Sequence, residues 1–248
     1  MTPLILGRAA LAEPEVAREA IISEDGAFIL VDKPYGETSF HVVNMIRRPI
    51  RVATGIKGVK VGHAGTLDPL ATGLLIIASR RKTKGLTELL GLEKTYLLRM
   101  RFGITTPSFD LERPLEIIGG EDKLTPDSVR AAIEALPGEH DQMPPIFSAI
   151  KQHGHAVYLK ARKGKEVILA TRPVMIHSAE VVDISLPFAT FRVRVSKGTY
   201  IRSIVRDIAE SLGTGGVLVD LVRESIAEWQ LEDALRLEEA VNLLSNHE

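Results

Sequence analysis

Two short runs of consecutive apolar residues constrain the fold of this chain more than any other feature of its sequence. The segment "AFILVDKPYG" begins apolar and reaches Asp32 directly before a Pro–Gly turn, and "LLIIAS" (74–79) forms a second run. A run of about four to eight apolar residues that ends at turn residues is typical of a strand buried on both faces. The sequence therefore predicts one buried strand that ends at Asp32 and another over residues 74–79.

Two other segments alternate between apolar and polar residues. In "TYLLRMRF" (95–102) the even-numbered residues from Tyr96 to Phe102 share one face, and "FRVRVSKGTY" (191–200) alternates until a turn at Gly198. A period of two is typical of half-exposed strands, which are common in antiparallel sheets. Together with the interspersed helices, this pattern predicts an α+β or mixed α/β fold with a largely antiparallel mixed sheet.

Helices are expected where apolar residues recur at helical spacing between capping residues. Thr38 or Ser39 is the expected N-cap of the first helix, and Pro49 is expected to end it because proline has no amide hydrogen. We expect a loop over residues 50–66, and further helices over 125–138, 201–213 and about 231–245.

The composition excludes several classes of protein. The chain has 248 residues and a formal net charge of −1, and it has no cysteine, so disulfide bonds, thiolate catalysis and zinc–thiolate sites are excluded. Its length suits one large domain or two modest ones. The N-terminus lacks the leader of a signal peptide, and the longest apolar run, "GLLIIA", is too short to span a bilayer. We therefore expect a cytoplasmic protein without a membrane partner.

Basic residues are concentrated in three segments although the chain as a whole is nearly neutral. Residues 38–67 include five Lys and Arg residues but no acidic residue, and "RRKTK" (80–84) and "KARKGK" (160–165) follow. Such segments are often only solvated faces of a protein. Their segregation on a chain of net charge −1 favours a surface that faces a polyanion.

The segment "GHAGTLDPLATGLL" (62–75) places a single acidic residue, Asp68, in a turn rich in glycine and proline. An aspartate in such a turn is most often only a turn former. Because a buried strand follows and anchors the loop, the same aspartate could also act as a nucleophile, a general base or a metal ligand. Only His63 is near enough in sequence to share a metal ion, and Leu70 stands where an aspartate-dependent phosphatase would have its second acid. We therefore predict neither a metal site nor phosphatase activity.

A third feature, "SKGTYIRS" (196–203), places Tyr200 and Arg202 where a strand passes into a helix. In the ordinary interpretation, the tyrosine lies at the edge of the core and the arginine on the surface. In the functional interpretation, the tyrosine offers a stacking face and the arginine pairs with a carboxylate, for which Asp68 is the natural candidate. An arginine within about 4–6 Å of an aspartate lowers the pKa of that aspartate and keeps it anionic.

These segments together resemble the TruB family, the bacterial tRNA pseudouridine synthases that modify the T-loop uridine at tRNA position 55. The resemblance covers roughly residues 27–225, and its segments occur in the order of the family. They are "DKPYGETSFHVV", "GHAGTLDPLATGLL", "KTYLL", "MPPIFSAIKQHGHAVYLKARKG" and "VSKGTYIRSIVRDIAESLG".

The resemblance implies a role for each candidate residue. Asp68 is similar to the catalytic nucleophile, Arg202 to the arginine that pairs with it, and Tyr96 to the tyrosine that stacks on the flipped base and assists removal of the C5 proton. The remaining substrate-binding residues implied are His63, which fills the space left by the extruded base, and Tyr200 and Leu221, which line the uracil pocket.

The resemblance also implies the architecture and partners. We expect a single catalytic domain over residues 1–248 with a central RNA-binding cleft and without the C-terminal PUA module of many relatives. The expected partner is the T stem-loop of tRNA, bound by a monomer that needs no cofactor, metal or obligate protein partner.

Two features of the sequence qualify the resemblance. "GITTPSFDLERP" lacks the glycine that often closes the equivalent stretch, which puts a role for Asp110 in doubt, and Glu224 follows Arg223 where relatives often have a second basic residue. The alternative function is a tRNA-binding or tRNA-folding module in which catalysis is secondary.

Overall fold

The computed structural model describes residues 5–147, 151–152, 155–156 and 170–245. Contacts between residues divide the chain into two compact units. Unit 1 consists of Met1–Lys94 and Val222–Glu248, and unit 2 consists of Thr95–Leu221. Each unit is described by itself below.

Unit 1 contains a sheet in the order β1-β2-β4-β13, to which β15, β3 and β14 add at the side of β2, β4 and β13 respectively. Strand β2 is antiparallel to β4, whereas β13 is parallel to β4 and β15 is parallel to β2. The sheet is therefore mixed, as the sequence predicts. The strand bounds are Ile5–Leu6 (β1), Phe28–Lys33 (β2), Val61–His63 (β3), Thr72–Ser79 (β4), Gly216–Ile226 (β13, of which residues 222–226 belong to this unit), Trp229–Gln230 (β14) and Leu235–Arg236 (β15).

Alternate residues of the two predicted buried strands enter two different cores. Ile29 of β2 and Ile77 of β4 pack on the side of the helices, while Leu30 and Ile76 pack on the opposite side with Leu89. Both faces of the sheet are buried, which explains why these strands are continuously apolar.

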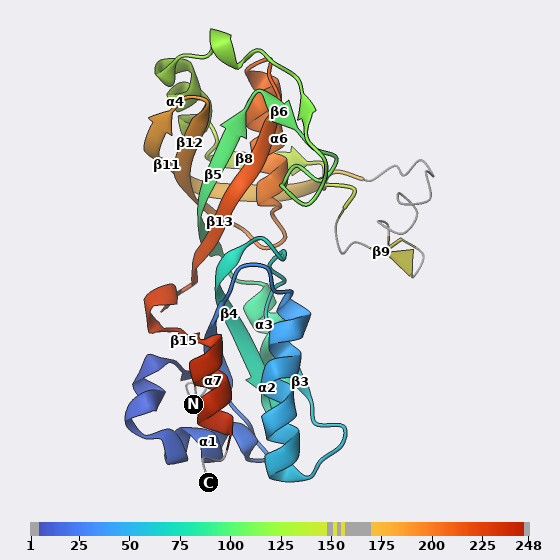
Figure 1. The fold of residues 1–248 in the computed structure, drawn as a ribbon, viewed down its shortest axis with the longest axis vertical. Coiled ribbons are helices and arrows are strands. Elements are labelled where there is room, and N and C mark those ends of the chain that lie inside the picture. The colour runs from blue at the N-terminus through green and yellow to red at the C-terminus, as the bar shows by residue number, and fades with distance from the viewer. Residues whose placement is uncertain (1–4, 148–150, 153–154, 157–169, 246–248) are drawn as a thin grey trace. The chain divides into compact units, whose positions relative to one another are not determined.

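Three helices of unit 1 cover one face of its sheet. The helices α1, α2 and α7 contact one another, and Figure 1 shows α7 alongside α2. Their apolar sides supply much of the core on this face, including Ile21, Ile46 and Leu243. The helix bounds in this unit are Pro14–Ile22 (α1), Ser39–Thr54 (α2), Leu86–Leu90 (α3) and Leu237–Leu244 (α7), with 3-10 turns at Arg8–Ala12, Arg80–Gly85 and Leu231–Asp233.

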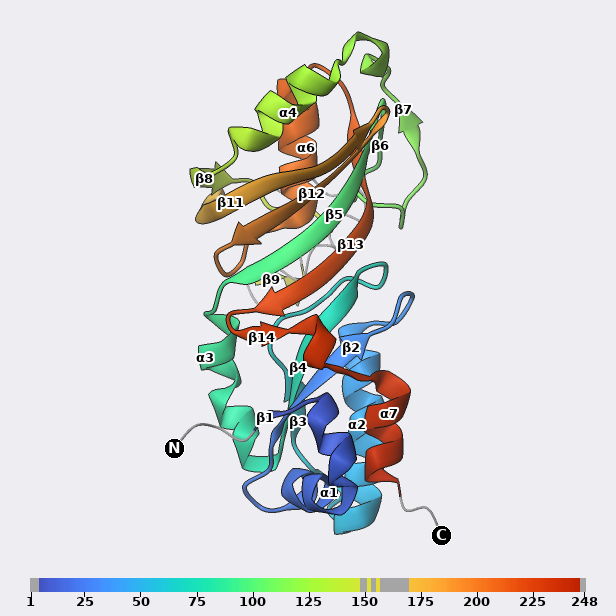
Figure 2. The ribbon, with the colours of Figure 1, turned by 90° about the vertical axis from the view of Figure 1, so that its left-hand side faces the viewer.

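Unit 2 has the strand order β13-β5-β12-β11-β8, with antiparallel pairing of β11 to both β12 and β8. Helix α4 packs against β11 and α6 (Figure 2). The alternation in β5 has the predicted outcome, since Tyr96, Leu98, Met100 and Phe102 are all buried. The bounds are Lys94–Phe102 (β5), Ile104–Thr105 (β6), Glu116–Ile117 (β7), Pro126–Glu134 (α4), Gly138–Gln142 (β8), Lys151–Gln152 (β9), His155–Ala156 (β10), Arg172–Ser185 (β11), Phe188–Val195 (β12) and Ile201–Ser211 (α6), with a 3-10 turn at Glu121–Lys123.

The prediction that Pro49 ends the first helix is wrong. Helix α2 begins after the N-cap Thr38, whose side chain accepts a hydrogen bond from His41, but it continues through Pro49 to Thr54. Burial of Ile46 and Ile50 on either side of the proline stabilises the helix more than the missing hydrogen bond weakens it. The expected loop over 50–66 is therefore also wrong in part, since it contains the end of α2 and all of β3.

The last predicted helix is shorter than expected. Residues 231–245 do not form one helix, because Leu235 and Arg236 pair in parallel with Val31 and Asp32 of β2. The helix α7 begins only at Leu237, with Glu239 accepting a hydrogen bond from the amide of Arg236 at its start. Leu235 and Arg236, which apolar periodicity assigned to the helix, therefore form a strand that pairs with β2.

Candidate active site

The predicted nucleophile Asp68 lies on a loop of unit 1 that leads from β3 into β4, and it is half-buried. The loop is tied to the start of α2, where the buried Ser39 hydroxyl both accepts a hydrogen bond from the amide of Leu67 (2.8 Å) and donates one to its carbonyl (3.0 Å). Both the amide and the carbonyl of Leu67, the residue before Asp68, are therefore held by Ser39.

Lys33 holds the other side of the loop. This lysine is the last residue of β2 and is fully buried. Its ammonium group donates to the backbone carbonyls of Pro34 (2.9 Å), Glu37 (2.6 Å) and Pro69 (3.3 Å). Burial lowers the pKa of Lys33 to about 8, although the nearby carboxylates of Glu37 and Asp68 act in the opposite direction. A cation next to the Asp68 loop thus anchors its backbone.

Arg223 of β13 is a second buried cation at this loop. Its guanidinium donates to the carbonyls of Leu74 (2.6 Å) and Gly65 (3.1 Å). Strand β4 lies between β2 and β13, and Gly73 pairs with Lys33 on one side and with Arg223 on the other. Gly73 has φ +103°, and a Cβ atom there would lie 2.5 Å from the carbonyl oxygen of Arg223. The order of strands therefore requires glycine at this position and places one cation on each side of the loop.

His63 ends β3 in the same unit. Burial lowers its pKa, the charge of Arg223 lowers it further, and a hydrogen bond with the backbone of Gly65 acts in the opposite direction. This shift favours the neutral imidazole, and Nδ1 is buried without a hydrogen-bond partner among the described residues. A neutral ring of this kind suits stacking or van der Waals contact better than ion pairing.

The other predicted site residues belong to unit 2. Tyr96 is buried on β5, and Leu221 is buried on the neighbouring strand β13. Tyr200 is the N-cap of α6 and Arg202 lies in its first turn. Asp68 and Arg202 are in different units, so their pairing stays a prediction.

Within unit 2, Arg202 pairs with a carboxylate that the sequence left in doubt. Arg202 is 5% exposed and Asp110 is 4% exposed, and their side chains form an ion pair at 3.3 Å. Asp110 also accepts hydrogen bonds from the Ser108 hydroxyl (2.6 Å) and the amide of Glu112 (3.0 Å), and Arg202 donates to the carbonyl of Ser108 (3.1 Å). Asp110 therefore fixes the guanidinium of Arg202, although no closing glycine follows it.

The basic segments differ in how many of their charged side chains form hydrogen bonds or ion pairs within the protein. In the first, Arg48 and Arg51 are exposed on α2, whereas Arg47 donates to the carbonyl of Val61 (2.9 Å). In the second, Arg81 forms ion pairs with Glu24 and Asp25. The third, 160–165, lies outside the described residues. The exposed side of α2 thus remains the strongest described candidate for a phosphate-binding surface.

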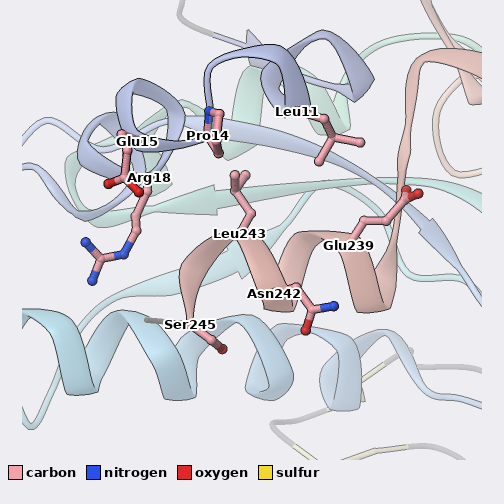
Figure 3. A pocket seen from close by; sticks show the side chains of 8 residues that line it. All are labelled: Leu11, Pro14, Glu15, Arg18, Glu239, Asn242, Leu243 and Ser245. Atoms are coloured by element: carbon pink, nitrogen blue, oxygen red, sulfur yellow. The ribbon is translucent and has the colours of Figure 1, made fainter. Parts of the chain in front are cut away.

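Two hollows of unit 1 lie away from the predicted site residues. One, of about 400 Å³, is lined by Leu11, Arg18, Glu239 and their neighbours (Figure 3), and another of about 400 Å³ lies between α2 and α7. Among the described residues, no group of three or more His, Asp and Glu side chains is placed to hold a metal ion. No helix in the described part of the chain is long and apolar enough to cross a membrane.

Comparison with known proteins identifies the class. Residues 51–201 match the family model described as "TruB family pseudouridylate synthase (N terminal domain)". This match places the chain among the pseudouridylate synthases. Within that class, the chain belongs to the TruB family, as the sequence predicts. The matched residues include Asp68, Tyr96, Asp110 and Tyr200.

Relatives of similar length extend the match beyond residue 201. The chain is 41% identical over 225 residues to a protein of Phocaeicola vulgatus named "tRNA pseudouridine synthase B", covering 91% of this chain and 96% of that one. A protein of the same name from Chlorobaculum tepidum is 42% identical, with 91% and 93% covered.

Solved structures show the same fold. A chain in the "Crystal Structure of a Cbf5-Nop10-Gar1 Complex" is 27% identical with a TM-score of 0.67, covering 91% of this chain and 56% of that one. A chain in the archaeal box H/ACA sRNP Nop10–Cbf5 complex is 26% identical with a TM-score of 0.62, covering 87% and 52%. This chain therefore spans about half the length of these solved chains.

Proposed function

We propose that this enzyme converts uridine to pseudouridine at position 55 in the T-loop of tRNA, with Asp68 as the nucleophile. The observation that carries the proposal is the way in which the Asp68 loop is held. Ser39, Lys33 and Arg223 fix the backbone of this loop. A carboxylate on a fixed loop is preorganised for attack on a substrate. The choice of tRNA as substrate rests on the names of the relatives that are about 40% identical.

The proposed reaction is an isomerisation, so its atoms balance without a co-substrate. Attack by Asp68 on the uridine or its sugar breaks the bond between N1 of the base and C1′ of the ribose. The uracil rotates in the site, a bond forms between C5 and C1′, and the bond made by Asp68 breaks, which regenerates the free carboxylate. The proton on C5 leaves, and N1 carries a proton in the product. No oxidant, reductant or energy source enters this balance.

The other residues act on the base and on the charge of the site. A T-loop base leaves its stack to reach the enzyme, and stacking on Tyr96 in the pocket offsets part of that unfavourable free energy. Tyr200 and Leu221 line the same pocket, and the neutral His63 fills the space that the base leaves. Arg202, oriented by Asp110, is the proposed partner of the Asp68 carboxylate.

Phosphate contacts complete the proposed complex. The exposed Arg48 and Arg51 of α2 bind the backbone of the stem-loop without reading its sequence. Because such contacts release counterions, we expect tRNA affinity to fall as salt concentration rises.

The test is release of tritium from tRNA transcripts labelled at C5 of uridine. The wild-type enzyme is expected to release tritium from position 55, whereas Asp68→Asn should reduce the rate at least about 1,000-fold because it removes the nucleophile. Asp25→Asn, at an exposed carboxylate of the same unit, is the matched control and should retain activity.

A transcript with cytidine at position 55 tests the position. It should release no tritium above background if position 55 is the only target. Binding of tRNA by a wild-type enzyme that releases no tritium from any transcript would overturn the proposal and favour the RNA-binding alternative.

A further inference from the structure

Tyr200 is held by residues that have no part in the function proposed above. The side-chain amide of Gln142, the last residue of β8, accepts a hydrogen bond from the amide of Tyr200 (2.8 Å) and donates one to its carbonyl (3.1 Å). Gln142 is 3% exposed. An uncharged side chain with a donor and an acceptor at one tip is required for this pair of bonds, which a carboxylate cannot form.

Arg172 holds the ring of the same tyrosine. It is the cross-strand partner of Gln142 at the start of β11. Its guanidinium carbon lies 4.4 Å from the centre of the Tyr200 ring, and the guanidinium also donates to the carbonyl of Gly198. The cation occupies one face of the ring. Within the described part of the chain, this face of the ring is therefore taken by Arg172, and a substrate base would stack on the opposite face.

The residue after Gln142 ties the first turn of α6 to the same strand end. The carbonyl of Met143 accepts hydrogen bonds from the hydroxyl of Ser203 (2.8 Å) and the guanidinium of Arg206 (3.2 Å). The helix start that carries Tyr200 and Arg202 is therefore attached to β8 by its backbone and by two of its side chains.

We propose that Gln142 and Arg172 are positioning residues for Tyr200, which together fix its backbone and leave one ring face for the flipped base. The inference rests on the proposed function, in which Tyr200 lines the uracil pocket. Stacking depends on the plane and offset of the ring. A ring that is free to turn would bind the base in several orientations, and few of these would place C5 against the ribose.

A spectroscopic test observes the ring directly. The chain has 4 tyrosines, so uniform labelling with 3-fluorotyrosine gives few ¹⁹F resonances, and Tyr200→Phe assigns one of them. Gln142→Met and Arg172→Met are expected to shift or broaden the Tyr200 resonance. Glu139→Gln, at an exposed position of β8, is the matched control and should move no tyrosine resonance.

A kinetic test observes the consequence. In both variants we expect kcat to fall about tenfold or more, while KM for tRNA changes less than about twofold because phosphate contacts dominate binding. Arg172→Lys, which keeps the charge, should recover part of the rate. A variant that lost activity only by unfolding would lose kcat in proportion to its folded fraction, which circular dichroism measures.

The outcomes separate this inference from the proposed function. An unmoved Tyr200 resonance in both variants, or a moved resonance with unchanged kcat, would overturn the positioning role. If the wild-type enzyme formed no pseudouridine, the proposed function would fail. The resonance shifts alone would then decide whether Gln142 and Arg172 hold the Tyr200 ring.

Discussion

In unit 1 the predicted nucleophile lies on an irregular loop, whereas in unit 2 the predicted arginine lies in the first turn of a helix. The loop is held by buried cations, Lys33 and Arg223, whose described hydrogen bonds go to backbone carbonyls. The helix start is held by a buried carboxylate, Asp110, that pairs with Arg202 itself. Cations thus orient the backbone beside an acid in one region, and an acid orients a cation in the other.

This difference indicates what each region must supply. A loop has no regular hydrogen bonds of its own, so its carbonyls need donors from outside. Lys33 and Arg223 supply these donors. Arg202 belongs to a regular helix, so only its long side chain needs to be fixed, and a paired carboxylate does that.

The largest expected effect on stability comes from breaking the pair in unit 2. Asp110→Asn removes the buried carboxylate that pairs with the guanidinium of Arg202, which should lower the free energy of unfolding by about 3–5 kcal/mol. Urea unfolding measures this change. The double variant with Arg202→Met should lose less than the sum of the single losses, because the two residues interact. Strictly additive losses would contradict the pairing.

A smaller loss of stability is expected when a buried cation of unit 1 is removed. Arg223→Met leaves the carbonyls of Gly65 and Leu74 without their donor, which should lower the free energy of unfolding by about 2–4 kcal/mol. The freed Asp68 loop should also lower kcat at temperatures where the variant is fully folded. Arg51→Met, at an exposed arginine of α2, is the control for stability. Unchanged kcat in folded Arg223→Met would show that the loop keeps its geometry without this cation.

The last effect, which is the smallest when it is expressed per pH unit, distinguishes the two cations of unit 1 by how their contributions to stability depend on pH. Burial lowers the pKa of Lys33 in the folded protein from 10.5 to about 8. Between these values the unfolded chain binds more protons at this residue than the folded one, so its contribution to stability rises with pH, and it is constant below pH 8.

The measurement compares wild type with Lys33→Met. The difference between their free energies of unfolding should change in favour of wild type from pH 8 to 10.5, by at most about 1.4 kcal/mol per pH unit. The same comparison with Arg223→Met should show no such change, because arginine stays charged over this range. A flat difference for Lys33 would contradict the lowered pKa.

Much of the fold follows from local sequence patterns. The apolar runs predicted β2 and β4, the alternation predicted β5 and β12, and the helix expected over 125–138 begins as α4 at Pro126, after the N-cap Thr125. The failures, at Pro49 and at Leu235–Arg236, occur where contacts distant in sequence outweigh local preference. Burial of the α2 face overrides the proline, and pairing with β2 overrides helical periodicity.

The partners of the site residues were harder to predict than the residues themselves. Resemblance to a family names Asp68, Tyr200 and Arg202 because these lie in short motifs. Asp110 and Gln142 lie 92 and 58 residues from their partners Arg202 and Tyr200 (202 − 110 and 200 − 142). The position of Lys33 at the end of an apolar run was a signal in the sequence that this lysine could be buried. A buried ammonium group needs several hydrogen-bond acceptors, which would have pointed to a role in holding nearby backbone.

The sequence by itself determined the family, the strands β2, β4, β5 and β12, the helices α2, α4 and α6, and the residues proposed for catalysis, because each is encoded in a short continuous segment. Only the tertiary structure decided that Lys33 and Arg223 stand on both sides of Gly73, that Asp110 orients Arg202, and that Gln142 and Arg172 hold Tyr200. The physical reason is that buried polar groups must find partners, and strand order and helix packing set which distant residues are within reach.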